Sequence, residues 1–337
     1  MTRMATSSAS VEYAAARSAV GLIDRRDHGV LEATGRDRAT FLNALLSNDV
    51  KSLVAGQGCA ATLLDVHGKV QVVLLVWVLD ARILIVTPPG TAASTLEALD
   101  RYLFSEKVDL RDASEEWALV LLTGPEASSL VERLAGAAPE ARPWSHVAGS
   151  LDGVDVRLVR GGGETGGPEI WIAAPAAEAE RVRTTVTGAG AVALGPAAIE
   201  SLRIEAGAPR FPADIGPAVL LPEVPFETLV SYTKGCYPGQ EVVVRIRDRG
   251  HVNRHLRGLL LEGDAVPPAG SEVVADDTVI GAVTSATRSF GLDRPIALAM
   301  VRRQHAEPGT AVGVRVGDRV VPATVSGLPF TRVTREP

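Results

Sequence analysis

The sequence predicts an α+β protein built in three parts. Residues 11–110 combine helical patterns with short apolar strands. Residues 117–187 follow a strand, helix, strand, strand, helix order, which is typical of a small ferredoxin-like domain. From residue 254 onward, short β segments recur at regular spacing between Gly/Pro turns, and this pattern predicts a small barrel. A chain of 337 residues is also long for one hydrophobic core, so two or three domains are expected.

The first part is predicted to contain three helices and three strands. Its elements are a short polar helix, a strand near 29–34, an amphipathic helix over 37–46, strands over 68–79 and 82–87, and a helix over 91–104. Cys59, in the Gly-rich run 56–61, is expected to be a small buried residue at the start of a strand.

The middle and last parts are separated by clear turn residues. The middle elements are strands over 117–123, 154–160 and 169–173 with helices over 126–134 and 176–187. Its Gly-rich stretch 161–168 is expected to be a flexible loop. It lacks the spacing of a dinucleotide or phosphate-binding loop, so nucleotide binding is not predicted. The barrel strands are predicted over 256–262, 272–275, 278–286, 296–301 and 311–316.

Composition excludes several classes of function. A net charge of −6 provides no basic field for nucleic acid. The longest apolar stretch, 70–79, is far shorter than the roughly 20 residues that span a bilayer. Residues 1–10 have no apolar core of a signal peptide and are expected to form a loose tail. Two cysteines do not make a disulfide framework, so we expect a cytoplasmic protein with reduced thiols.

The most informative run is 233–241, because it holds one of the two cysteines and one of only four lysines. A thiol is a nucleophile or a ligand as the thiolate, and the cation of Lys234 would favour that form of Cys236. Gly235 and Gly239 permit close backbone approach, and Pro238 predicts a turn, so an exposed loop is expected. The alternative is a Gly/Pro turn with a small buried cysteine. The stretch that follows, 241–247, favours a strand by propensity; if it is a short helix, its dipole would favour the thiolate further.

These residues resemble the signature of the YgfZ-type folate-binding proteins, relatives of the glycine cleavage T-protein that support iron-sulfur enzymes. The matching run is Lys234-Gly235-Cys236-Tyr237-Pro238-Gly239-Gln240-Glu241. The resemblance continues in the stretches 35–42, 47–50, 64–70, 202–207 and 281–285, and so covers most of the chain.

The resemblance implies a three-part T-protein-like architecture. A discontinuous folate-binding core would comprise residues 11–113 and 195–252. The other two domains would be a ferredoxin-like domain over 114–194 and a small barrel over 253–330. Tetrahydrofolate or a derivative would occupy the central channel. Cys236 would then lie near the opening between the domains.

The resemblance also suggests which residues contact the folate. T-proteins use a carboxylate just after a strand, but the matching stretch 87–96 contains no Asp or Glu, and the loss of such a group costs on the order of 10² to 10⁴ in rate. The folate loop would lie at 161–169, where Glu164 and Glu169 replace the family's tyrosine. Glu169 could accept the N–H edge of a pteridine, and Arg203 with Glu205 forms a second candidate pair. The alternative for these charged residues is a solvated or ion-paired surface role.

A stably bound metal is not predicted. Iron-sulfur clusters normally need four ligands, and the chain offers only Cys59 and Cys236. His251 and His255 are four residues apart but lack a third ligand. Contact with a cluster would therefore require an iron-sulfur carrier or client protein as partner.

The main hypothesis is thus a folate-binding accessory factor, leaning toward a non-enzyme, that supports assembly or repair of iron-sulfur clusters in client enzymes, including tRNA-modifying ones. Cys236 and Lys234 would be its reactive residues. The rival is a tetrahydrofolate-dependent aminomethyltransferase, and a third reading is a scaffold that has lost the ligand. The sequence leaves open the clients, the folate form, the chemistry of the thiol and the oligomeric state.

Overall fold

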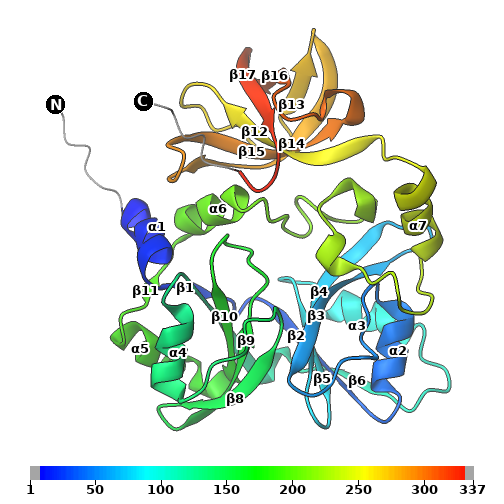
Figure 1. Ribbon diagram of the computed structural model, residues 1–337, viewed down its shortest axis with the longest axis vertical. Helices are drawn as coiled ribbons and strands as arrows, with labels where there is room; N and C mark the ends of the chain where they lie inside the picture. The colour runs from blue at the N-terminus through cyan, green and yellow to red at the C-terminus, as the bar shows by residue number, and fades with distance from the viewer. Residues whose placement is uncertain (1–7, 331–337) are drawn as a thin grey trace.

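The computed structural model describes residues 8–330 and shows two sheets and a barrel connected by seven α-helices in that range (Figure 1). The predicted α+β class with a ferredoxin-like middle part and a C-terminal barrel is confirmed. The expected loose tail differs in extent, because helix α1 (Ser8–Ser18) already begins at residue 8. The rest of that tail lies outside the described residues.

The first sheet is a five-stranded antiparallel layer with the order β3-β4-β5-β2-β6. Its strands are β2 (Gly29–Thr34), β3 (Gln57–Leu64), β4 (Val70–Val78), β5 (Ile83–Thr87) and β6 (Asp109–Asp112). Helices α2 (Arg38–Leu45) and α3 (Ala92–Asp100) cover one face, where Leu42 and Leu99 are completely buried. Cys59 is a buried residue of β3, as predicted.

The second sheet has six strands in the order β11-β1-β7-β10-β9-β8. They are β1 (Gly21–Asp24), β7 (Trp117–Thr123), β8 (His146–Leu151), β9 (Val154–Arg160), β10 (Glu169–Pro175) and β11 (Val192–Ala193), with helices α4 (Ala127–Ala135) and α5 (Ala179–Gly188) on one face. Strands β1, β8 and β11 have no counterpart among the predicted elements. β1 lies within the range expected for the first domain, yet its strand partners are β7 and β11.

The uncovered faces of the two sheets pack against each other. Their shared core contains Trp77 of β4 and Trp171 of β10, whose ring centroids lie 6.3 Å apart in an edge-to-face arrangement. Both side chains are almost entirely buried. Aromatic residues of this size fill large volumes and prefer such tilted contacts, so the pair fixes the spacing of the sheets where the cavity opens.

The third part is a closed barrel with the order β12-β15-β14-β13-β16-β17. Its strands are β12 (Arg254–Leu261), β13 (Glu272–Ala275), β14 (Thr278–Ser289), β15 (Arg294–Arg302), β16 (Ala311–Val316) and β17 (Arg319–Ser326). Closure leaves no free sheet edge. The barrel lies above helix α6 (Pro196–Glu205), which separates it from the second sheet (Figure 1).

After α6 the chain returns to the first sheet before it enters the barrel. Ile215, Leu221 and Tyr237 from this segment share a core with residues of β3, β4 and the barrel. Short 3₁₀ turns punctuate the chain at Ser114–Glu116, Ala176–Glu178, Leu221–Glu223, Glu227–Leu229 and Arg303–His305. No helix in residues 8–330 is both long and apolar enough to cross a membrane.

The segment favoured as a strand after the cysteine motif is a helix. Helix α7 (Gln240–Arg249) begins after Gly239, whose φ of 78° lies in the left-handed region. A Cβ at Gly239 would lie 2.5 Å from the carbonyl oxygen of Asp65, so only glycine fits here. Val243 on the inner face of α7 is completely buried. Packing on the β3–β4 turn therefore overrides the β propensity of the valines.

Candidate functional site

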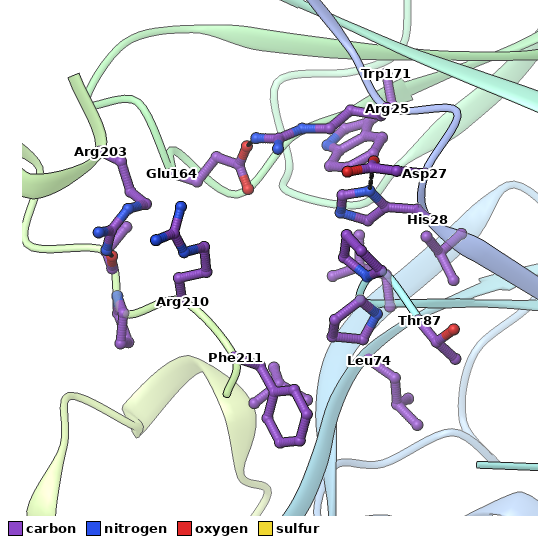
Figure 2. A pocket seen from close by; sticks show the side chains of 17 residues that line it. Arg25, Asp27, His28, Leu74, Thr87, Glu164, Trp171, Arg203, Arg210 and Phe211 are labelled. Atoms are coloured by element: carbon purple, nitrogen blue, oxygen red, sulfur yellow. Dashed lines mark hydrogen bonds and ion pairs between the residues drawn. The ribbon is translucent and has the colours of Figure 1, made fainter. Parts of the chain in front are cut away.

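A cavity of about 320 Å³ lies where the two sheets meet the segment that follows α6 (Figure 2). Its walls come from the β1–β2 turn, strands β4 and β5, the turn after β5, the Gly-rich loop, β10 and the end of α6. The lining residues are Arg25, Asp27, His28, Val73, Leu74, Leu75, Val86, Thr87, Pro88, Pro89, Glu164, Trp171, Arg203, Ala208, Pro209, Arg210 and Phe211.

One side of the cavity is apolar. Leu75 and Val86 belong to neighbouring strands of the first sheet, and Phe211 projects from the segment after α6 (Figure 2). The indole of Trp171, with 2% of its surface exposed, completes this side. A concave site with aromatic and aliphatic walls and a few polar groups is typical of small-molecule binding.

Two buried N–H donors of cavity-lining residues, and the hydroxyl of Thr87, have no partner within residues 8–330. Arg25 forms an ion pair with Glu164 of the Gly-rich loop, and its guanidinium carbon lies 5.8 Å from the centroid of the Trp171 ring. Within residues 8–330, Arg25 Nε and Trp171 Nε1 are buried without a hydrogen-bond acceptor. Unpartnered buried donors are costly, and a bound ligand with acceptor atoms would satisfy them.

The β1–β2 turn contributes an acid and a base. His28 Nδ1 lies 2.8 Å from Asp27 Oδ1, and this hydrogen bond lowers the pKa of Asp27. The imidazole also packs edge-on against Trp171, with 5.7 Å between the ring centroids. A carboxylate on Nδ1 holds the ring in the tautomer with a bare Nε2. The pair therefore presents a hydrogen-bond acceptor to the cavity.

Arg203, expected as a folate contact, does line the cavity. Its guanidinium is already engaged, because it donates to Asp214 Oδ2 and Glu200 Oε2, each at 2.8 Å. Asp214 is completely buried, and it also accepts hydrogen bonds from Thr284 and Ser285 of the barrel. Arg203 therefore connects α6 to the barrel, and it also lines the cavity.

Glu169 does not line the cavity. Its buried carboxylate accepts hydrogen bonds from the backbone N–H of Gly163 at 2.8 Å and from both N–H and hydroxyl of Thr165 at 2.6 and 2.7 Å. Burial, together with the nearby charge of Glu164, raises the pKa of Glu169 to about 7. The folate contact at Glu169 stays a prediction. In the structure its carboxylate shapes the Gly-rich loop, which carries Glu164 to the cavity.

Glu205 also lies outside the cavity. It accepts hydrogen bonds from Tyr13 of α1 at 2.6 Å and from Ser289 of the barrel at 2.6 Å. Arg17 of α1 donates a further one at 2.8 Å. Glu205 joins α1, α6 and the barrel, and its folate contact stays a prediction.

The stretch that follows β5 is brought to the cavity through Thr87, Pro88 and Pro89. None of these carries a carboxylate, which is consistent with the missing acid noted in the sequence. The carboxylates that do line the cavity, Asp27 and Glu164, come from the β1–β2 turn and from the Gly-rich loop.

The cysteine motif lies apart from the cavity. Cys236 is exposed, on the loop that leads into α7, and it is not among the cavity-lining residues. Tyr237 is buried, and its backbone N–H donates to Gln240 Oε1 at 3.2 Å. Gly235 and Glu241 are exposed. The expected exposed loop is present, and Cys236 does not itself line the central cavity.

Lys234 is held by the end of helix α2. Its ammonium donates to the carbonyl oxygens of Asn43 and Leu46 and lies 4.9 Å from the centroid of the Tyr237 ring. Burial lowers the pKa of Lys234 to about 8. Its hydrogen bonds anchor the cysteine loop to α2, where the helix carbonyls carry partial negative charge. Among residues 8–330, no group of three or more His, Cys, Asp and Glu side chains could hold a metal ion.

Sequence reasoning missed Arg25, Asp27 and His28. The available signal was the polar run Arg25-Arg26-Asp27-His28-Gly29 between two apolar stretches, which marks a turn. Its closeness to Trp171 and Glu164 depends on β1 pairing in the second sheet while β2 pairs in the first. A linear pattern does not contain that information.

Two family models match the chain. Residues 2–234 match the GCVT N-terminal domain, and residues 254–331 match the glycine cleavage T-protein C-terminal barrel domain. An aminomethyltransferase of Streptomyces avermitilis is 31% identical over 95% of this chain and 89% of its own length. One from Thermus thermophilus is 32% identical over 95% and 89%, respectively. A putative chloroplastic transferase of Arabidopsis thaliana is 27% identical over 92% of this chain and 71% of its own length.

The same fold occurs in a solved structure. The crystal structure of the glycine cleavage system aminomethyltransferase T from Bartonella henselae superposes with a TM-score of 0.86, covering 96% of this chain and 89% of that one. The sequences are 23% identical, so this likeness supports the three-part architecture alone.

Proposed function

This chain belongs to the glycine cleavage T-protein family, and on that premise we propose that its central cavity binds tetrahydrofolate or a derivative. The observation that carries the proposal is the pair of unpartnered buried donors, Arg25 Nε and Trp171 Nε1, beside the apolar wall of the cavity. A reduced pteridine offers acceptor atoms for such donors. Its amino and N–H edge suits a carboxylate such as that of Glu164. The residues present therefore fit the ligand.

Calorimetric titration of the purified protein with tetrahydrofolate under anaerobic, reducing conditions tests this proposal. Arg25→Gln should weaken binding by about tenfold to a hundredfold, because a charged hydrogen-bond donor is lost. Arg26→Gln is the matched control, since Arg26 is exposed and pairs with Asp24 outside the cavity. Absence of binding by the wild type would overturn the proposal.

We propose, as the cellular role, an accessory factor that uses the bound folate and Cys236 to support iron-sulfur enzymes, including tRNA-modifying ones. The support is the motif 234–241, which resembles that of the YgfZ-type proteins, and the exposure of its thiol in a chain with one other cysteine. Because Cys236 lies away from the cavity, folate and thiol would act at separate places. The thiol would meet a cluster carrier or client protein at the surface.

Complementation of a deletion strain tests the role. The readouts are the activity of a [4Fe-4S] enzyme and the level of thiolated tRNA, for wild type, Cys236→Ala, Lys234→Ala and the control Cys59→Ala. We expect the wild type and Cys59→Ala to restore both, and Cys236→Ala to restore neither. Full restoration by Cys236→Ala would overturn the proposed part of the thiol.

The second candidate is tetrahydrofolate-dependent aminomethyl transfer, and the names of the relatives from Streptomyces and Thermus favour it. Against it stands the turn after β5, which brings Thr87, Pro88 and Pro89 to the cavity in place of a carboxylate. Loss of a general acid or base typically costs on the order of 10² to 10⁴ in rate. Formation of methylene-tetrahydrofolate from an aminomethyl donor by the purified protein, at a rate well above the uncatalysed one, would establish the transferase and displace the accessory role.

A further inference from the structure

The β1–β2 turn holds His28 in a fixed place beside the cavity. The backbone at Gly29 approaches β5 and α3 so closely that a Cβ there would lie 2.5 Å from Thr87 Oγ1 and 2.6 Å from Ala92 Cβ. Glycine is therefore required at the start of β2, where the chain packs closely on Thr87 and Ala92. Figure 2 shows His28 on one side of the cavity, facing Glu164 and Arg210 on the other.

Asp27 determines which nitrogen of His28 carries the hydrogen. The 2.8 Å contact joins Nδ1 to a carboxylate oxygen, which can only accept a hydrogen bond while it is ionised. The neutral ring therefore has its proton on Nδ1 and a bare Nε2. Within residues 8–330, Nε2 has no hydrogen-bond partner, so it is available to a ligand.

The charged groups around the ring are already paired with one another. Arg25 pairs with Glu164, Arg203 with Asp214 and Glu200, and Arg210 with Glu200. These residues and Asp27 are the other charged groups that line the cavity or contact its lining. His28 Nε2 is thus an acceptor on the cavity lining that these ion pairs do not occupy.

Reduced and oxidised pteridines differ in what they present to such an acceptor. The tetrahydropteridine ring carries N–H groups at positions 5 and 8, whereas the corresponding nitrogens of the fully oxidised ring are bare acceptors. A bare Nε2 forms a hydrogen bond with the former and an unfavourable acceptor-to-acceptor contact with the latter. A site built to bind an N–H group rejects the analogue that lacks it, because its own polar group is then left unpaired.

We propose that His28, oriented by Asp27, makes the cavity selective for reduced over oxidised folates through a hydrogen bond that a ring N–H of the reduced pteridine donates to Nε2. This inference rests on the proposed folate binding and concerns which form is bound. His28 is the specificity-determining residue, and Asp27 is a positioning residue that acts through it.

The test is the measurement of Kd for tetrahydrofolate and for folic acid by anaerobic calorimetry. For the wild type we expect tetrahydrofolate to bind at least about tenfold more tightly than folic acid. His28→Phe, which has no acceptor, should bring the ratio of the two Kd values near one. His28→Asn keeps an amide oxygen as an acceptor, so its ratio should stay above that of His28→Phe. Asp27→Ala, which frees the tautomer, should reduce the ratio several-fold.

The outcomes distinguish the proposal of folate binding from the proposal that His28 sets the selectivity. His251→Asn, at an exposed histidine outside the cavity, is the control and should behave as the wild type. If the wild type binds neither ligand, the proposed folate site fails. If it binds tetrahydrofolate and the ratio of the two Kd values is unchanged in His28→Phe, the folate site stands and the role of His28 is overturned.

Discussion

Tyr13 of helix α1 donates a hydrogen bond of 2.6 Å to the carboxylate of Glu205 in helix α6, across 192 positions of the sequence. Ser201 and Ser289 donate to the other oxygen at 2.8 and 2.6 Å. Burial by itself raises the pKa of Glu205, but the hydrogen bonds from Ser289, Tyr13, Ser201 and Arg17 outweigh it and leave the pKa below its ordinary value. The carboxylate is thus a buried junction between the N-terminal helix, α6 and the barrel.

Glu205→Ala is therefore expected to destabilise the protein without touching the cavity. Removing one partner of a buried charged network typically costs about 3 kcal/mol in the free energy of unfolding. Denaturant unfolding measures this loss, with Glu115→Ala at an exposed position as the control. The Kd for tetrahydrofolate of the folded variant should match that of the wild type. A variant of normal stability with weakened folate binding would restore Glu205 as a ligand contact.

His146 at the start of β8 should make stability depend on pH in the acid range. Burial, followed by the charge of Arg157, lowers the pKa of His146 from 6.5 to about 4. The unfolded chain therefore binds the proton more readily, and stability is present above pH 6.5 and lost as the pH falls toward 4. His146→Phe should flatten this window, whereas His67→Asn at an exposed site should not. The test is measurement of the free energy of unfolding of these variants between pH 4 and pH 7.

Glu169 should make the free energy of unfolding depend on pH with the opposite sign to His146. Its pKa is raised to about 7, chiefly by burial, so the folded chain holds the proton more tightly than the unfolded chain. The stability that this group contributes is complete below pH 4.5 and is lost as the pH rises through 7. Glu169→Gln should remove the decline in a plot of unfolding free energy against pH. An unchanged decline would show that another group causes it.

The two thiols should differ sharply in reactivity. Cys236 is exposed, whereas Cys59 is buried, and burial raises the pKa of the Cys59 thiol to about 12. Because alkylation requires an accessible thiolate, iodoacetamide should label one thiol per native chain and two per unfolded chain. Mass spectrometry of Cys236→Ser should show no label under native conditions. Native labelling of Cys59 would contradict the buried environment of β3.

The sequence determined the class of fold because local patterns carry that information. Alternating apolar residues and Gly/Pro turns predict the barrel strands, and the run from Lys234 to Glu241 identifies the motif without reference to contacts. The burial of Cys59 likewise follows from an apolar strand. The sequence favours a strand where helix α7 forms, because its valines have β propensity. It does not reveal that Gly239 packs on the turn at Asp65, which is a contact between distant segments.

Tertiary structure alone decided which residues form the site. Arg25 and His28 reach Trp171 and Glu164 because β1 pairs in one sheet while β2 pairs in the other, so the turn between them crosses the gap. Glu169 and Glu205 carry charges that the sequence assigned to a ligand, yet both are buried and satisfied by protein donors. A side chain's type says which chemistry it can perform, but its partner depends on contacts between segments far apart in the chain.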